Sequence, residues 1–335
     1  MQRYRLYGGG GSPYSMKMRA ILRYRRLPFD WVLITPALRE QLRHDGPPVI
    51  PILQFPDGNL QVDSTPLAYM LEDAHAERSI IPPDPCHGFL SDLIEDMADE
   101  WFTKMMFHYR WHREVDQIYS SRQIIADNSP GVTGEALERA AEAIRARQVG
   151  RMPIVGCTPE NAPVIEAGYH EVLAILDTFV TREEFLFGTR PALADFGLFG
   201  QFKVLASDYT PRNEMIDRAP RVYDWIRRLD DLSGVDGHWH GEGELRAATR
   251  SLLQLAARQY LPFLEANRQA VVDGADSVEL EIDGKPWRQA PFKYQAKCFD
   301  RLQKRFAAVE GEPAQRLGAV LAETGCLPYL EAPSS

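Results

Sequence analysis

The 335-residue chain lacks several features that would restrict its function at once. It has only four cysteines and no C-x-x-C pair, so neither a zinc site nor a redox dithiol is indicated. It has no apolar run as long as a membrane-spanning helix and no internal repeat. Its net charge of −9 gives no basic footprint for nucleic acid. These absences favour a globular protein with reduced thiols that binds neither nucleic acid nor membrane.

The N-terminus passes directly from Met1 into a strand pattern, with no leader sequence before it. Export and membrane insertion are therefore not expected, and a cytoplasmic location is. Local basic clusters do occur despite the negative total. The largest near the N-terminus, Arg23, Arg25 and Arg26, is expected to form a solvated helix face.

Four consecutive glycines, Gly8 to Gly11, follow a short strand pattern and precede Ser12 and Pro13. Glycine allows sharp turns and close backbone approach, while serine followed by proline is typical of a helix start. Free N–H groups at such a start stabilise an anion, and a thiolate is one candidate. The alternative is that Ser12 only caps the helix. A nucleotide loop is not indicated, because the Lys-Ser/Thr ending of a P-loop is missing.

The first 85 residues predict a β-α-β unit followed by β-β-α. Strands are expected at 4–7, 28–34, 46–55 and 59–62, with helices at 13–26 and 65–75 and a charged loop after the second strand. Prolines at 82, 83 and 85 then mark a domain boundary.

The remainder of the chain predicts mostly helix. We expect three segments: an α/β domain at 1–85, an all-helical domain at 86–233, and a C-terminal extension at 234–335. The helical domain should hold helices at 89–121, 134–149, 161–180, 192–206 and 219–230. The extension should hold helices at 244–272, 292–308 and 313–324, with a strand or hairpin near 278–287.

Three short motifs in this order resemble the glutathione transferase superfamily, and most closely its bacterial serine/cysteine type. They are Ser12-Pro-Tyr-Ser after the first strand, Val49-Ile50-Pro51 before the third, and Asp63-Ser64 after the fourth. The likeness covers residues 3 to about 232. It implies a thioredoxin-like N-terminal domain, a helical second domain and glutathione as cosubstrate without a metal, and it allows a homodimer.

The resemblance also implies a role for each motif. Ser12 would hydrogen-bond the glutathione sulfur, and Ile50, ahead of a cis Pro51, would pair with the cysteinyl backbone. Asp63 and Ser64 would hold the γ-glutamyl end, although both could simply cap a helix. Tyr7 is a rival to Ser12, since a tyrosine near this place serves the tyrosine classes.

The second substrate would be a small hydrophobic electrophile. The candidates for its pocket are Tyr14, Trp101, Met105 and Tyr109, and the alternative for each is a place in the core. His108 and His112 lie four residues apart, but no third metal ligand is indicated. The sequence departs from the family's usual capping pattern at Pro191 to Phe196. Asp195 is present there, but Ala192 stands where the pattern has a Ser or Thr hydroxyl.

Two functions therefore stay open. One is a transferase in which Ser12 stabilises the glutathione thiolate for attack on the electrophile. The other is a non-catalytic binding or scaffold protein whose extension binds a partner or covers the cleft.

Overall fold

A computed structural model describes residues 3–42, 44, 46–180 and 185–331; the last four residues of the predicted extension fall outside it. The described chain divides into two compact units, each built from three stretches. The first unit comprises residues 1–80, 109–150 and 196–236, and the second comprises 81–108, 151–195 and 237–335. The three-segment division drawn from the sequence stays a prediction.

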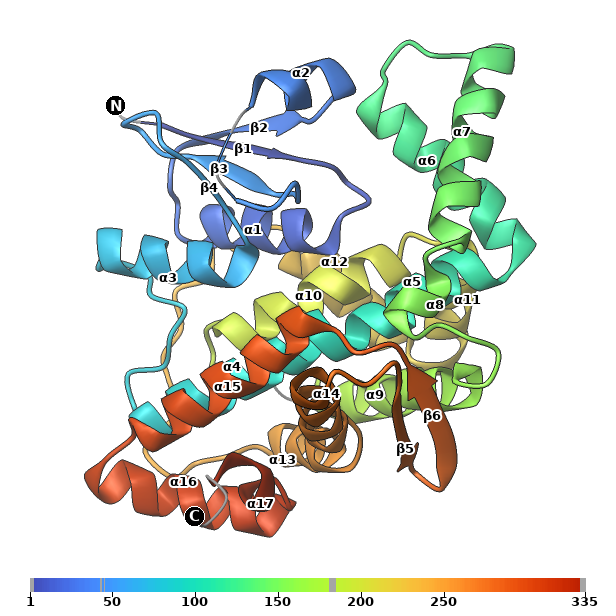
Figure 1. Cartoon of the computed structure of the whole chain (residues 1–335). Helices are drawn as coiled ribbons and strands as arrows, with labels where there is room; N and C mark the ends of the chain where they lie inside the picture. The colour runs from blue at the N-terminus through green and yellow to red at the C-terminus, as the bar shows by residue number, and fades with distance from the viewer. Residues whose placement is uncertain (1–2, 43, 45, 181–184, 332–335) are drawn as a thin grey trace. The chain divides into compact units, whose positions relative to one another are not determined.

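The first unit contains a mixed sheet of the thioredoxin-like kind, which confirms the predicted fold class. Among the described residues its strand order is β2-β1-β3-β4, with β1 and β2 parallel and the other neighbours antiparallel. In Figure 1, α1 and α3 lie on one face of the sheet and α2 lies on the other. The strands and helices are β1 (Tyr4–Gly8), α1 (Pro13–Tyr24), β2 (Phe29–Leu33), α2 (Pro36–Gln41), β3 (Ile52–Gln54), β4 (Leu60–Val62) and α3 (Ser64–Ala74).

Helix α2 occupies the stretch that the sequence predicted as a charged loop, so that prediction was wrong. The signals for it were present: Thr35 accepts a hydrogen bond from Leu38 N at 3.2 Å, and Pro36 stands at the first helical position. Leu38 and Leu42 pack on a small core that includes Tyr7 and Ile52. The helix is short and mostly exposed, which is why its apolar period was too weak to recognise.

The rest of the first unit is helical. Its helices include α6 (Glu114–Asn128), α7 (Gly134–Val149), α11 (Tyr209–Arg218) and α12 (Pro220–Leu229), while α5 (Thr103–His112) and α10 (Leu193–Leu205) have residues in both units. The helix predicted over 89–121 is broken at Arg113, whose backbone is extended at φ −92° and ψ 137°. No proline or glycine marks this break, so the sequence pattern did not reveal it.

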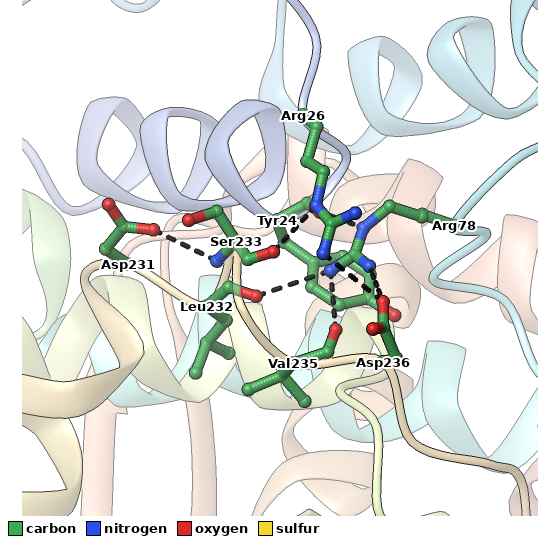
Figure 2. Close-up of polar contacts among 8 residues, drawn as sticks. All are labelled: Tyr24, Arg26, Arg78, Asp231, Leu232, Ser233, Val235 and Asp236. Atoms are coloured by element: carbon green, nitrogen blue, oxygen red, sulfur yellow. Dashed lines mark hydrogen bonds and ion pairs between the residues drawn. The ribbon is translucent and has the colours of Figure 1, made fainter.

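Two arginines of the sheet-bearing part hold the segment that follows α12 (Figure 2). Arg26 Nε donates to Ser233 O at 2.7 Å, and Arg78 donates to Val235 O at 2.6 Å and to Asp236 Oδ1 at 2.5 Å. The Arg78 guanidinium also lies 4.3 Å from the centre of the Tyr24 ring. Side chains of the sheet-bearing part therefore hold residues 232–236, which belong to the first unit.

The basic cluster at the end of α1 is only in part the solvated face that the sequence predicted, because Arg26 is exposed but Arg25 is not. The Arg25 side chain is buried and paired with Glu72, and Arg23 Nη1 donates to Asp230 O at 2.9 Å. Each arginine thus has a specific acceptor, which a charge pattern alone does not reveal.

The second unit is built from helices and one hairpin. Its elements are α4 (Pro85–Met97), the π-helical turn η1 (Ala98–Phe102), α8 (Met152–Val155), α9 (Ala162–Phe179), α13 (Ala247–Leu255), the π-helical turn η2 (Ala256–Tyr260), α14 (Leu261–Asp273), β5 (Val278–Ile282), β6 (Lys285–Gln289), α15 (Lys293–Ala307), α16 (Gly311–Thr324) and α17 (Leu327–Leu330). The hairpin turns at Asp283 and Gly284 with φ of 49° and 74°, as its Asp-Gly pair predicted.

The C-terminal extension is part of the core of the second unit. Helix α13 packs on α9, and α15 and α16 pack on α4. Trp101 is buried against Phe263 and Trp287, with ring centres 5.2 and 4.9 Å apart. Removal of residues 237–335 would expose this core, so truncation there cannot isolate a function of the extension.

Lys104 connects the hairpin of the extension to helix α5. Its buried ammonium donates to Gln289 Oε1 at 2.8 Å and to Val155 O at 2.9 Å, and lies 4.7 Å from the centre of the Phe263 ring. Burial lowers the pKa of Lys104 to about 8.

Asp195 is the one residue of the family's capping pattern that this chain keeps. It accepts hydrogen bonds from two backbone N–H groups in the second unit. Its carboxylate accepts from Ala192 N at 2.8 Å and from Leu186 N at 3.1 Å. Burial raises the pKa of Asp195 to about 7, because the loss of hydration outweighs the bonds that favour the charged form.

We predict that Asp195 makes the protein less stable as pH rises. Its carboxyl titrates near 3.8 in the unfolded chain and near 7 when folded, so unfolding releases a proton between these values. The free energy of unfolding should decrease as pH rises from about 4 to about 7, relative to Asp195→Asn, which lacks this titration. Urea unfolding of both proteins across this range measures the free energy of unfolding of the wild type minus that of Asp195→Asn. If this difference increased as pH rises, the raised pKa would be contradicted.

Candidate functional site

The glycine run connects β1 to α1 by close packing of its backbone. None of the described residues Gly8 to Gly11 has a positive φ, so what these glycines supply is close backbone approach and not a left-handed backbone angle. A Cβ on Gly8 would lie 2.5 Å from Ser15 Oγ, and one on Gly10 would lie 2.8 Å from Asp127 Oδ2. The glycines therefore allow the loop to lie directly against α1 and α6.

Ser12 is the N-cap of α1, which is the role that the sequence gave as the alternative to an anion site. Its Oγ accepts a hydrogen bond from Ser15 N at 3.3 Å, and its own N–H donates to Gly9 O at 3.1 Å. Ser12 is half-buried. A hydroxyl can accept one bond and donate another, so capping leaves its hydrogen available to an anion at the helix start.

The Ile50–Pro51 peptide bond is cis, as the resemblance implied. Pro51 is buried and Ile50 half-buried at the edge of β3. Ile50 Cδ1 lies 4.0 Å from the position that a Cβ on Gly9 would occupy. The fold thus brings the glycine loop and the cis-proline loop together.

Asp63 and Ser64 stand where α3 begins. Asp63 has φ 77° and ψ 113°, a conformation that is costly for a residue with a side chain. Ser64 is buried, and the fully buried Lys17 of α1 places its Nζ 3.5 Å from both Ser64 Oγ and Thr65 Oγ1. The start of α3 is therefore connected to the helix that Ser12 caps, with a positive charge between them.

Tyr7, the rival to Ser12, directs its hydroxyl elsewhere. The side chain packs in the small core beneath α2 with Ile34 and Ile52, and its Oη donates to Gln54 Oε1 at 3.1 Å. The hydroxyl thus already has an acceptor on β3.

The candidates for the substrate pocket are mostly buried. Trp101 donates from Nε1 to Gln259 Oε1 at 3.1 Å, Met105 is buried in the same second unit, and Tyr109 donates to Glu214 Oε2 at 2.9 Å in the first. Tyr14, on the first turn of α1, is half-buried. Because Trp101, Met105 and Tyr109 are buried, a place in the core is favoured for each of them, which was the alternative given from the sequence. Their contact with a substrate stays a prediction.

Across the described residues, no group of three or more His, Cys, Asp or Glu side chains is arranged to hold a metal ion. His108, of the spaced histidine pair, is buried with Nε2 3.0 Å from Glu166 Oε1. In that same part of the chain, no helix has the length and apolar character needed to cross a membrane.

The sequence did not identify Arg110 and Asp208 as neighbours of the site. Arg110 Nη1 donates to Gly11 O at 2.7 Å, and two further bonds of 2.8 and 3.0 Å join its guanidinium to the Asp208 carboxylate. The available signal was a charged residue between the aromatic residues Tyr109 and Trp111, since a buried charge requires a partner. Nothing in the sequence indicated that the partner lies 98 residues further along the chain.

Residues 6–79 match the family model described as glutathione S-transferase, N-terminal domain. This stretch, which includes β1 to β4 and α3, is therefore similar to the N-terminal domain of glutathione S-transferases. A comparison with curated protein sequences gives no match.

Solved structures similar to this chain include three bacterial proteins. The β-etherase LigF from Sphingobium sp. strain SYK-6 is 19% identical, with 76% of this chain and 99% of that one covered and a TM-score of 0.49. A glutathione S-transferase from Methylobacterium radiotolerans, in complex with glutathione sulfonate, is 20% identical (73% and 100% covered, TM-score 0.42). A glutathione S-transferase from Methylobacillus flagellatus with glutathione bound is 16% identical (74% and 98% covered, TM-score 0.40). Similarity this distant does not assign an activity to the chain.

We predict that Gly8→Ala destabilises the protein and that Gly11→Ala does not. The added methyl group at position 8 would overlap the buried Ser15 and the Trp31 ring, 2.9 Å away, and should lower the free energy of unfolding by about 1–3 kcal/mol. At position 11 the nearest atom, Ile124 Cγ1, lies at an ordinary 3.5 Å, so the change should stay within about 0.5 kcal/mol. Urea unfolding measures both, and equal losses would show that packing is not what requires glycine at position 8.

We also predict that Asp63→Gly stabilises the fold, because glycine adopts φ 77° without steric cost. The expected gain in the free energy of unfolding is about 1 kcal/mol, at the lower end of the range for such strain. Asp63→Asn, which keeps the Cβ, is the matched control and should change stability little. A loss of stability in Asp63→Gly would mean that contacts of the carboxylate outweigh the strain.

Proposed function

We propose that the protein is a glutathione transferase in which Ser12 stabilises the glutathione thiolate for attack on a small hydrophobic electrophile. The observation that carries the proposal is the convergence of three loops in the first unit. The glycine loop before Ser12 lies beside Ile50, and Lys17 of the helix that Ser12 caps lies beside Ser64.

Each part of glutathione would have a partner at these loops. The Ile50 backbone, ahead of the cis bond, would pair with the cysteinyl residue. At the start of α3, the Asp63 carboxylate would accept from the γ-glutamyl amine, while the Ser64 hydroxyl and the free N–H groups of the helix would bind the carboxylate. Lys17 donates to Ser64 Oγ and so helps to hold this hydroxyl at the start of the helix.

The Ser12 hydroxyl is sufficient for the chemistry without a general base. A thiol with an ordinary pKa of about 8.5 is mostly protonated at neutral pH, and lowering that pKa by about two units requires about 2.7 kcal/mol. A hydrogen bond to the charged sulfur contributes about 1.5–3 kcal/mol and the helix dipole about 0.3–1 kcal/mol. The thiolate would then attack the electrophilic carbon held beside it.

The alternative of a non-catalytic scaffold has less support. It relied on a separate extension, but α13, α15 and α16 complete the core of the second unit. It also relied on the incomplete capping pattern, yet Asp195 satisfies the backbone there without the missing hydroxyl.

We predict that Ser12→Ala still binds glutathione but ionises its thiol less. The pKa of the bound thiol should rise by about 1–2 units, the equivalent of the lost hydrogen bond. Calorimetry measures binding, and the ultraviolet absorbance of the thiolate, followed against pH, measures its ionisation. The loss of the cap should also lower the free energy of unfolding by about 1 kcal/mol.

Two matched variants separate the hydroxyl from other effects. Ser12→Thr keeps both the hydroxyl and the capping ability and should leave the thiol pKa near its wild-type value. Tyr7→Phe should have no effect, because the Tyr7 hydroxyl bonds to Gln54. No glutathione binding by the wild type at millimolar ligand would refute the proposed function, and a pKa increase in Tyr7→Phe alone would transfer the role of Ser12 to Tyr7.

A further inference from the structure

The Gly11 carbonyl, immediately before Ser12, is held by a side chain outside the thioredoxin-like segment. Arg110, near the end of α5, donates from Nη1 to this oxygen at 2.7 Å. The glycines before Ser12 leave the loop few side-chain contacts of its own. The Arg110 bond is therefore a strong external restraint on the backbone that carries Ser12.

The Arg110 guanidinium is itself rigidly held. Nε and Nη2 donate to the two oxygens of Asp208 at 2.8 and 3.0 Å, the forked geometry that arginine and carboxylate prefer. The two side chains are only 8% and 2% exposed. Ser120 Oγ adds a third bond to Asp208 Oδ1 at 3.1 Å. These bonds fix the position of the Arg110 guanidinium, and the guanidinium in turn fixes the position of the Gly11 carbonyl.

The Asp208 carboxylate bonds to Arg110 and does not cap the helix that it precedes. It occupies the N-cap position of α11, where aspartate is a favoured cap, but within the described chain its carboxylate makes no capping bond. The capping bond comes instead from Asp116, whose Oδ1 accepts from Thr210 N at 2.7 Å. A residue in a capping position that does not cap indicates that its contact with Arg110 has another purpose.

We infer that Arg110, fixed by Asp208, is a positioning residue for the thiolate-binding loop: it holds the Gly11 carbonyl and so sets where the Ser12 hydroxyl points. The inference rests on the proposed function for its effect on glutathione. The effect on the loop itself does not depend on any ligand.

The test removes the pair without leaving a lone buried charge. Loss of Arg110 alone would strand the Asp208 carboxylate and could unfold the protein, so Arg110→Met is combined with Asp208→Asn. The matched control is Arg25→Met with Glu72→Gln, which removes another buried ion pair of the first unit at the opposite end of α1. Both double variants are checked for folding by circular dichroism.

The first measurement is hydrogen exchange of the Ser12 amide, which bonds to Gly9 O, in the ligand-free protein. Exchange should be about tenfold faster in the Arg110/Asp208 variant and unchanged in the control. The second is the pKa of the bound glutathione thiol, which should rise by about one unit, a tenfold change in the ionisation constant, while the glutathione dissociation constant changes by less than about threefold.

The outcomes separate the two proposals. If Ser12→Ala raises the thiol pKa but the Arg110/Asp208 variant changes neither the pKa nor the exchange rate, Arg110 has only a structural role and the inference is wrong. If the wild type binds no glutathione, the proposed function fails. The exchange rate of the Ser12 amide then decides alone whether Arg110 positions the loop.

Discussion

Close approach of the backbone between β1 and α1 is the constraint on which the candidate site depends. Gly8 lies against Ser15 and Trp31 at distances that exclude a Cβ, and a Cβ on Gly10 would require the Asp127 side chain of α6 to move. Because the loop packs closely against its neighbours, Gly9 lies beside Ile50 of the cis-proline loop, and Ser12 begins α1 three residues after Gly9. The same closeness exposes the Gly11 carbonyl to Arg110, so the position of Ser12 depends on helices far away in the sequence.

Two charged side chains are buried next to this loop system. Lys17 donates to hydroxyl groups at the start of α3, and Arg110 is paired with the Asp208 carboxylate. The forked bonds between an arginine and a carboxylate restrict the position of both side chains, so Arg110 is suited to fixing geometry.

The order of strands and helices in the first 85 residues could largely be predicted because its signals are local, whereas the thioredoxin-like fold and the site residues came from the resemblance. Ser12-Pro13 marks a helix start, and Asp283-Gly284 marks a hairpin turn, whatever the rest of the chain does. The contacts of Arg26 and Arg110 could not be predicted, because their acceptors are distant carbonyls and carboxylates that leave no pattern. For the glycine run, the sequence shows that glycine is present but not whether a backbone angle or the available space requires it, and at Gly8 it is the space.

Lys104 shows how the extension became inseparable from the helices that it covers. Its buried ammonium depends on Gln289 of the hairpin for one of its two hydrogen bonds, and on Trp287 and Phe263 for part of its aromatic surroundings. A descendant that lost the hairpin would retain a cation on an exposed apolar surface with half of its acceptors gone. Water would then hydrate the ammonium, so both the dry surroundings of Lys104 and the lowering of its pKa depend on the hairpin.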